Sequence, residues 1–311
     1  MNYHQFFIRK PSGGFRRINA PDEELKAYSL ELLFLLEEEL QRINWWSKSG
    51  QHIYSYRKGY SCKTLAEDIC CFTKDTLLYD LYSMDIKDYF GSITRDMYND
   101  SVAALYNQGC NLPLSFWDKV WDASCIGPGK IKSIAQGNPL SPIISNIVGW
   151  VFVDMPMVNG LLPDIISQTA YYRYSDNIFI VAKRRDGYSR ASVMDRIGKF
   201  LCGRITDHLM FKVDVRSNRQ ENTVLGIRLG MRPQLKNKKW LRSVFYRVHT
   251  RGPSMLKDKD ILKEFGRMSY PKLIETVQGL SAYAISIDPS MERYILDNKP
   301  METIGVSHGN K

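Results

Sequence analysis

Apolar residues recur along the chain with two spacings, which predict alternating helices and strands. After Asp22, leucines three, four or seven residues apart line one face of a helix that extends to Ile43. Residues 143–155 are strongly apolar, but polar residues and Pro156 interrupt the stretch around them, which predicts a buried core helix rather than a membrane span. Further helices are predicted at residues 63–74, from about 94, at 189–208 and at 255–285.

β-Prone runs between these helices predict a sheet. Residues 78–86 form one strand, and the runs 170–174 and 178–182 form a hairpin joined by Ser175, Asp176 and Asn177. Other extended segments are predicted around the turn at residues 11–14 and near 210–216 and 222–230. This order of elements predicts an α+β fold, with helices packed on one face of the sheet.

Charge is distributed unevenly in this 311-residue chain, whose formal net charge is +10. From Asn222 to Lys257 there are nine Lys or Arg residues and no acidic residue, and no acid precedes Asp22. Aromatic residues are interleaved with the basic residues of segment 222–257, which favours a nucleic-acid surface over a merely solvated basic face. The N-terminus does not resemble a secretory signal, and the six cysteines show no CxxC spacing, so a reduced, cytoplasmic protein without a membrane partner is expected.

Two carboxylates are expected at one edge of the predicted sheet. Asp85 ends the run 78–86, and Asp176 lies at the tip of the hairpin. If these strands are neighbours, both side chains project from the same edge and can bind Mg²⁺, which uses one or two carboxylates together with substrate phosphates. Taken alone, Asp176 is better explained as a turn residue, because Asp-Asn is favourable at the tip of a hairpin.

Several segments, read together, resemble the reverse transcriptase family. Residues 174–177 (YSDN) look like its YxDD box, residues 84–93 (MDIKDYFGSI) like its first metal-binding motif, and residues 135–146 like its PQGxxxSP…SN segment. Residues 10–18, 56–61, 224–227 and 277–283 resemble the fingers motif, the F-x-x-G-x-S segment, the LG box and the thumb helix. These matches occur in the family's order and cover nearly the whole chain.

The resemblance implies a right-hand polymerase fold. Its fingers would occupy residues 1–78, and its palm, an antiparallel sheet backed by helices, residues 79–235 with a fingers insertion at about 98–133. A helical thumb would occupy residues 236–300, followed by a flexible tail at 301–311.

The resemblance also implies roles for individual residues. Asp85, Asp176 and Asn177 would form the catalytic centre, with Mg²⁺, or Mn²⁺ as the alternative, held by Asp85, Asp176 and the Ile86 carbonyl. The nucleotide would be bound by Lys10, Arg16, Phe90, Gln136, Gly137 and Tyr174, where Phe90 excludes a ribose 2′-hydroxyl. The acid-free region would contact nucleic acid through Lys238, Lys239, Arg242 and Arg247.

Two departures from the family pattern stand out. Asn177 replaces the second aspartate of the YxDD box, which removes one negative charge from the metal site. The lysine expected after the next helix is ambiguous, because Lys212 and Arg216 both fit. From these 311 residues, maturase, endonuclease, RNase H and integrase modules are not expected, and no Val-Thr-Gly triplet of the retron type follows the hairpin. The chain is therefore most similar to compact bacterial or phage reverse transcriptases of antiviral defence.

The expected function is RNA-directed DNA synthesis from dNTPs on an RNA template, which a dedicated non-coding RNA could supply. Template-independent or protein-primed synthesis is one alternative, because the motifs define the chemistry and not the template. A nucleic-acid-binding scaffold paired with an active partner reverse transcriptase is another, favoured by Asn177, and a homo-oligomer is also compatible. An RNA polymerase is less favoured because of Phe90.

Overall fold

The protein is described here from a computed structural model, which divides into two compact units. Unit 1 comprises residues 1–65 and 72–220, and unit 2 comprises residues 66–71 and 221–311. The structure describes residues 2–9, 14–76, 78–127, 132–165, 168–204, 209, 211–217, 222–230, 233–265 and 268–297. Lys10 and the predicted tail lie outside these residues. The finer division into fingers, palm and thumb stays a prediction.

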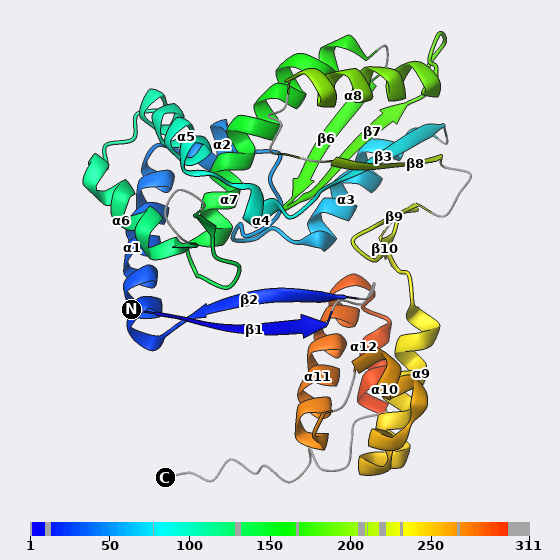
Figure 1. The fold of residues 1–311 in the computed structure, drawn as a ribbon. Helices are drawn as coiled ribbons and strands as arrows, with labels where there is room; N and C mark the ends of the chain where they lie inside the picture. Colours follow the sequence, from blue (N-terminus) through cyan, green and yellow to red (C-terminus); the bar gives the residue numbers. More distant parts are fainter. Residues whose placement is uncertain are drawn as a thin grey trace. The chain divides into compact units, whose positions relative to one another are not determined.

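A four-stranded antiparallel sheet forms the centre of unit 1 (Figure 1). Its strand order is β6-β7-β3-β8, so the predicted hairpin lies directly beside the strand that ends near Asp85. The strands are β3 (Tyr79–Ile86), β6 (Gln168–Tyr174), β7 (Asn177–Lys183) and β8 (Phe211–Ser217). The predicted strands at 78–86 and 210–216 and the predicted hairpin are thereby confirmed.

Both faces of this sheet carry buried residues, which corrects the expectation that only one face is covered. Met84, Ile178 and Ile180 belong to the main core, together with apolar residues of α7 and α8. On the opposite face Phe179 and Val181 are also buried, and Lys183 Nζ lies 4.6 Å from the centre of the Phe72 ring. β7 (NIFIVAK) is accordingly a nearly continuous apolar run, whereas β8 (FKVDVRS) alternates between apolar and polar residues.

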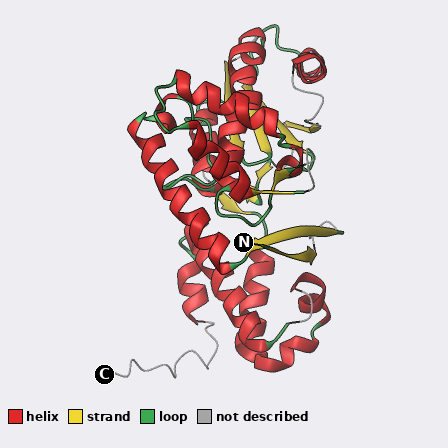
Figure 2. Cartoon of the chain, turned by 60° about the vertical axis from the view of Figure 1, so that its left-hand side comes forward, coloured by secondary structure: helices red, strands yellow, loops and turns green. Residues whose placement is uncertain are grey.

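Helices form most of the remainder of unit 1 (Figure 2). The first begins as predicted, because the Asp22 side chain accepts a hydrogen bond from the Leu25 N–H at 2.8 Å and caps the helix. The helices are α1 (Glu23–Arg42), α2 (Trp45–Lys48), α3 (Cys62–Thr73), α4 (Tyr89–Ser92), α5 (Arg95–Asn107), α6 (Leu114–Ser124), α7 (Ser141–Gly149) and α8 (Arg190–Arg204). Of these, α6 falls in the segment for which the sequence predicted only a fingers insertion.

The predicted core helix at 143–155 is not regular. Regular α-helix ends at Gly149, and π-helical turns follow at Trp150–Asp154 and Met157–Leu161 before a 3₁₀ turn at Leu162–Asp164. Among the described residues, Ser141–Leu161 is the one helical stretch with the length and composition of a membrane span, but 67% of it is buried inside the protein. These side chains contribute to the core.

Two smaller strand pairs complete unit 1. The ribbon of β1 (Tyr3–Arg9) and β2 (Phe15–Pro21) confirms the predicted N-terminal extended segments, and its residues are mostly exposed. The pair of β4 (Cys125–Ile126) and β5 (Ser133–Ile134) lies between α6 and α7 in the sequence. Segment 52–55 runs along the outer edge of β6, where the Arg173 N–H donates to the His52 carbonyl and the Tyr54 N–H donates to the Arg173 carbonyl.

Unit 2 combines a small sheet with helices, and residues 66–71 of α3 also belong to it. The strand predicted at 222–230 is instead two short strands around Leu225 and Gly226, which both have positive φ (48° and 82°) and form a tight turn. The predicted helix at 255–285 is broken into a 3₁₀ turn (Gly252–Lys257), α10 (Lys259–Phe265) and α11 (Tyr270–Ile287). The other elements are β9 (Thr223–Val224), β10 (Ile227–Arg228), β11 (Gln234–Leu235), α9 (Lys238–Arg251) and α12 (Met291–Asp297).

Candidate active site

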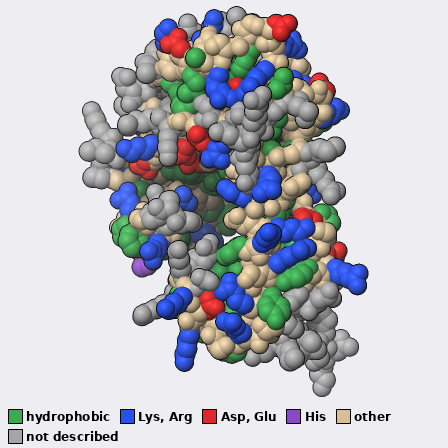
Figure 3. All heavy atoms as spheres, turned by 90° about the vertical axis from the view of Figure 1, so that its right-hand side faces the viewer, with side chains coloured by type: hydrophobic (Ala, Val, Ile, Leu, Met, Phe, Trp, Pro, Cys, Tyr) green, Lys and Arg blue, Asp and Glu red, His purple; other side chains and the backbone are tan. Residues whose placement is uncertain are grey.

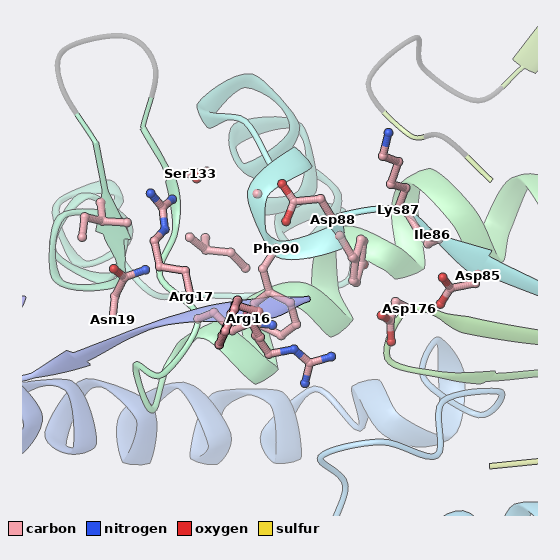
Figure 4. A pocket seen from close by; sticks show the side chains of 16 residues that line it. Arg16, Arg17, Asn19, Asp85, Ile86, Lys87, Asp88, Phe90, Ser133 and Asp176 are labelled. Atoms are coloured by element: carbon pink, nitrogen blue, oxygen red, sulfur yellow. The ribbon is translucent and has the colours of Figure 1, made fainter. Parts of the chain in front are cut away.

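Asp85 and Asp176 lie beside each other at one end of the central sheet. Asp85 is paired with Asn177 in the β3–β7 register, and the Ile86 N–H donates to the Asp176 carbonyl at 3.0 Å. Figure 4 shows the two carboxylates side by side at one end of a cavity, with Arg17 and Ser133 at the other end. The structure thus brings together the two carboxylates that the sequence singled out.

The environment of Asp176 opposes its ionisation. Burial raises the pKa of its carboxyl group, and the negative charge of Asp85 adds to the rise. Arg16 and the Asn177 amide act in the opposite direction, since Asn177 Nδ2 donates to Asp176 Oδ1 at 3.0 Å. A cation bound between the two carboxylates would relieve this repulsion.

The cavity beside the carboxylates has a volume of about 450 Å³ and is lined by residues of unit 1. Three predicted nucleotide-binding residues line it: Arg16 from β2, Phe90 from α4 and Gln136 from the loop before α7. Phe90 is partly buried and makes an edge contact with the Tyr89 ring. Sequence motifs that lie up to 160 residues apart, from Arg16 to Asp176, therefore converge on a single cavity.

The remaining predicted residues fall in different places. Gly137 has a φ of +128°, and a Cβ atom there would approach the Asn19 carbonyl to 2.8 Å, so glycine lets this loop pack on β2. Tyr174, at the end of β6, is half-buried and does not line this cavity. Lys212 stands opposite Asp85 in the β3–β8 register, whereas Arg216 forms an ion pair with Asp214. Lys10 is outside the described residues.

The sequence reasoning missed three charged residues that line the same cavity: Arg17, Lys87 and Asp88. Asp88 has a φ of 48°, which is uncommon for a residue other than glycine. A Cβ atom at Gly91 would collide with the Asp88 carboxylate, so Gly91 provides the space that this side chain occupies. When Arg17, Lys87 and Asp88 are included, three cationic and three carboxylate side chains of the described residues line the cavity. This pattern is suited to a phosphate ligand accompanied by a metal ion.

A buried polar network lies beneath the turn that carries Asp176. The Arg173 side chain is fully buried and forms two hydrogen bonds with Asp154, Nε to Oδ1 at 2.7 Å and Nη2 to Oδ2 at 2.9 Å. Its Nη1 donates to the Ser175 carbonyl at 3.2 Å, and the Ser175 N–H donates to Ser55 Oγ at 2.8 Å. Ser175 has a φ of 59°, so these bonds hold the turn in a conformation that serine rarely adopts.

Asn146 and Gly149 of α7 complete this network. Asn146 Nδ2 donates to the Ser55 carbonyl at 2.9 Å, and the Asn146 carbonyl accepts from Arg173 Nη2 at 3.2 Å. A Cβ atom at Gly149 would lie 2.7 Å from Arg173 Cζ, so only glycine leaves room for the guanidinium. Burial alone would lower the pKa of Arg173, but the combined effects of Asp154, Tyr89 and Tyr171 outweigh burial and raise it. The network fixes the backbone on which Asp176 is mounted.

Asp85 and Asp176 fit a divalent metal ion, although they form an incomplete ligand set. Within the described part of the chain, no group of three or more His, Cys, Asp or Glu side chains is arranged to hold a metal. Two adjacent carboxylates nevertheless match Mg²⁺, which usually retains waters and takes further oxygens from substrate phosphates. The neighbouring cationic side chains are in place for such phosphates.

The predicted nucleic-acid-binding residues lie on α9 of unit 2. Lys238 forms an ion pair with Asp288 (Nζ–Oδ2 2.5 Å), and Arg247 forms one with Asp258 (3.2 Å). Lys239 and Arg242 are exposed, with the Arg242 guanidinium 5.1 Å from the centre of the Tyr294 ring. Lys and Arg side chains are spread over much of the face shown in Figure 3, whereas acidic side chains occur in smaller groups.

No protein-family model and no curated protein matches the sequence. Solved structures do match the fold. An apo telomerase from Candida tropicalis superposes with a TM-score of 0.58 at 12% identity, over 96% of this chain and 58% of the telomerase chain. The RNA-dependent RNA polymerase of a human picorbirnavirus, in its insertion-loop deletion mutant, gives 0.51 at 12% identity, over 96% and 59% of the two chains.

The chain has a polymerase fold. A second Candida tropicalis telomerase structure, in complex with a fragment of telomeric RNA, agrees with a TM-score of 0.56 at 14% identity, over 96% of this chain and 55% of the telomerase chain. The chain spans somewhat more than half the length of these proteins. The similarity extends over both units, but at such low identity it concerns the fold alone.

Proposed function

We propose that the protein is an RNA-directed DNA polymerase, which adds dNTPs to a 3′-hydroxyl on an RNA template. The observation that carries this proposal is the position of Asp85 and Asp176, which lie side by side in a cavity that Phe90 and three cationic side chains also line. A telomerase and viral RNA polymerases share the fold, which supports template-directed nucleotide transfer. A bacterial antiviral role in the cytoplasm belongs to the same proposal and rests on the sequence resemblance.

In this proposal each residue has a defined task. Asp85 and Asp176 would hold Mg²⁺, with the Ile86 carbonyl as a further ligand. When bound, the metal would lower the pKa of the primer hydroxyl and neutralise charge on the phosphates. Arg16, Arg17 and Lys87 would bind the triphosphate through charge-assisted hydrogen bonds, and Lys10 is proposed to join them. The Arg173 network would keep Asp176 at a constant distance from Asp85.

Primer extension on defined RNA templates tests the proposal. Homopolymer RNA templates with complementary primers should support incorporation of the complementary dNTP only, and extension should require Mg²⁺ or Mn²⁺. Extension by every dNTP without a template would favour the template-independent alternative. Binding of the primed template without any extension, over the full range of metals, would favour a scaffold.

Phe90 is expected to distinguish dNTPs from rNTPs. Because its ring lines the cavity next to the carboxylates, Phe90→Val should open space beside the sugar and raise the relative efficiency of rNTP incorporation about 10- to 100-fold. Single-nucleotide kinetics with matched dNTP and rNTP substrates measure this ratio. Phe34→Val, at an exposed position on α1, is the control. An unchanged ratio in Phe90→Val would assign discrimination to another residue.

Asn177 is expected to set the metal preference. Asn177→Asp replaces the amide that donates to Asp176 by a carboxylate opposite Asp85, so it should strengthen metal binding about tenfold and destabilise the metal-free protein. The wild type should work better with Mn²⁺, which tolerates irregular geometry, whereas Asn177→Asp should shift towards Mg²⁺. Metal titrations of primer extension compare the two proteins. Asn107→Asp adds the same charge at an exposed site and serves as control. Superimposable curves for wild type and Asn177→Asp would contradict the prediction.

A further inference from the structure

A second cavity of about 400 Å³ adjoins the first, and the two share Arg16, Phe90 and Gln136 as lining residues. Its chemical character is different. Among the described residues, Arg16 is the one charged residue that lines it, and the other walls include Ile18, Tyr56, Pro139 and Pro142. A cavity with carboxylates and several cations therefore continues into a mainly uncharged one, which parallels the division of a nucleotide into a charged phosphate part and a flat, apolar base.

Tyr56 has an unusual conformation in this second cavity. Its φ of 52° places an aromatic residue in the left-handed region, where a bulky side chain is strained. Half of its surface is exposed, so burial of the ring does not compensate for the strain. If this turn served packing alone, Gly or Asn at position 56 would adopt the same left-handed conformation with less strain.

The neighbours of Tyr56 impose its conformation. Ser55 on one side is fully buried and accepts the Ser175 N–H from the catalytic turn. On the other side, the Arg57 guanidinium lies 3.7 Å from the centre of the Tyr60 ring and donates to the Gly50 carbonyl at 3.1 Å. Contacts on both sides of Tyr56 therefore restrain its backbone, and its side chain lines the cavity. Strain maintained in this way at a cavity indicates a function for the side chain.

We propose that the second cavity binds a nucleobase, which stacks on the ring of Tyr56. The inference rests on the proposed polymerase function and adds a binding residue to it. Every nucleobase offers an aromatic face, and stacking on an aromatic side chain does not depend on base identity. Segment 136–138, which also lines the cavity, is held in place, because the Asn19 N–H donates to the Gln136 carbonyl at 2.8 Å and the buried Asn138 side chain is itself hydrogen-bonded. The base can come from the template strand or from the incoming nucleotide.

Equilibrium binding with the fluorescent base 2-aminopurine, whose emission falls on stacking, separates these two sources. One arm places it at the first unpaired template position of a primed RNA with a chain-terminated primer. The other arm titrates 2-aminopurine deoxynucleoside triphosphate into the unlabelled complex. The variants are Tyr56→Phe, which keeps the ring, and Tyr56→Asn, which removes it and tolerates the left-handed backbone. Phe34→Ala removes an exposed ring elsewhere and is the control.

Emission should fall with the wild type and with Tyr56→Phe in one of the two arms. In that arm, Tyr56→Asn should bind roughly 5- to 100-fold more weakly, without a loss of thermal stability. The arm that responds identifies the base as template or incoming. Equal affinity and equal emission of wild type and Tyr56→Asn in both arms, with a wild type that extends primers, would overturn the inference. A wild type that quenches 2-aminopurine through Tyr56 but never extends a primer would instead refute the polymerase function and retain the base site.

Discussion

Replacing Asp176 by Asn is expected to abolish nucleotide incorporation and, at the same time, to stabilise the metal-free protein. The activity should fall roughly 1000-fold or more, because one of two carboxylates that hold the metal is lost. The stability should rise by about 1 kcal/mol, because the wild-type carboxylate is ionised in a partly buried site beside Asp85. Primer-extension rates and thermal unfolding in a chelator measure the two effects.

The sign follows from linkage between ionisation and folding. The folded state raises the pKa of Asp176 above its ordinary value of 3.8, so ionisation destabilises the fold as the pH rises through that raised value. At neutral pH the ionised Asp176 carboxylate therefore destabilises the folded state, and Asp176→Asn removes this destabilisation. The advantage of the variant should therefore disappear in acid, where Asp176 is protonated.

Metal binding provides the complementary measurement. Mg²⁺ should raise the unfolding temperature of the wild type, since a ligand at 100 times its dissociation constant stabilises by about 2.7 kcal/mol, and should hardly affect Asp176→Asn. Asp214→Asn, on the exposed side of β8, removes a carboxylate from the same sheet and should behave like the wild type. Equal metal-induced shifts in wild type and Asp176→Asn would place the metal elsewhere.

Breaking the Arg173–Asp154 pair is expected to have the largest effect on stability. Asp154→Asn leaves a fully buried guanidinium without its counter-charge and should cost about 3–5 kcal/mol. Urea unfolding measures this loss. The exposed pair of Arg95 and Asp118 offers a matched control, because Asp118→Asn should cost no more than about 1 kcal/mol.

A double variant separates stability from catalysis. Arg173→Met with Asp154→Leu removes both charges and should regain most of the stability that Asp154→Asn loses. It should still have low activity, because the hydrogen bond from Arg173 to the Ser175 carbonyl is missing and the turn before Asp176 is free to move. Full activity of the double variant would show that the pair contributes to packing alone.

The sequence predicted the parts of the site that depend on strand order. Asp85 and Asp176 end neighbouring β-prone runs, and their proximity follows from antiparallel pairing once the hairpin is recognised. Phe90, Gln136 and Arg16 could be assigned to the same cavity only through the resemblance to a family, because no local pattern connects them. Their catalytic roles stay predictions.

Other features could not be predicted because they depend on tertiary packing. Asp154 lies in the π-helical turn after Gly149, and its pairing with the distant Arg173 is a contact that helical periodicity does not predict. The left-handed conformations of Tyr56 and Ser175 are imposed by contacts with distant residues, and neither residue type signals them. One signal of the buried network is visible in the sequence, because Arg173 stands within a β-prone, aromatic run.

Segment 52–55 has a consequence for the behaviour of the protein in solution. β6 is an edge strand, and an uncovered edge with free N–H and C=O groups recruits strands from other molecules. On that edge, the backbone N–H and C=O groups of Arg173 are hydrogen-bonded to His52 and Tyr54. Arg173 lies next to a run of aromatic and β-prone residues. The loop that presents Tyr56 to the cavity therefore also pairs with part of this edge strand, and variants that detach it are expected to be recovered as oligomers or insoluble protein.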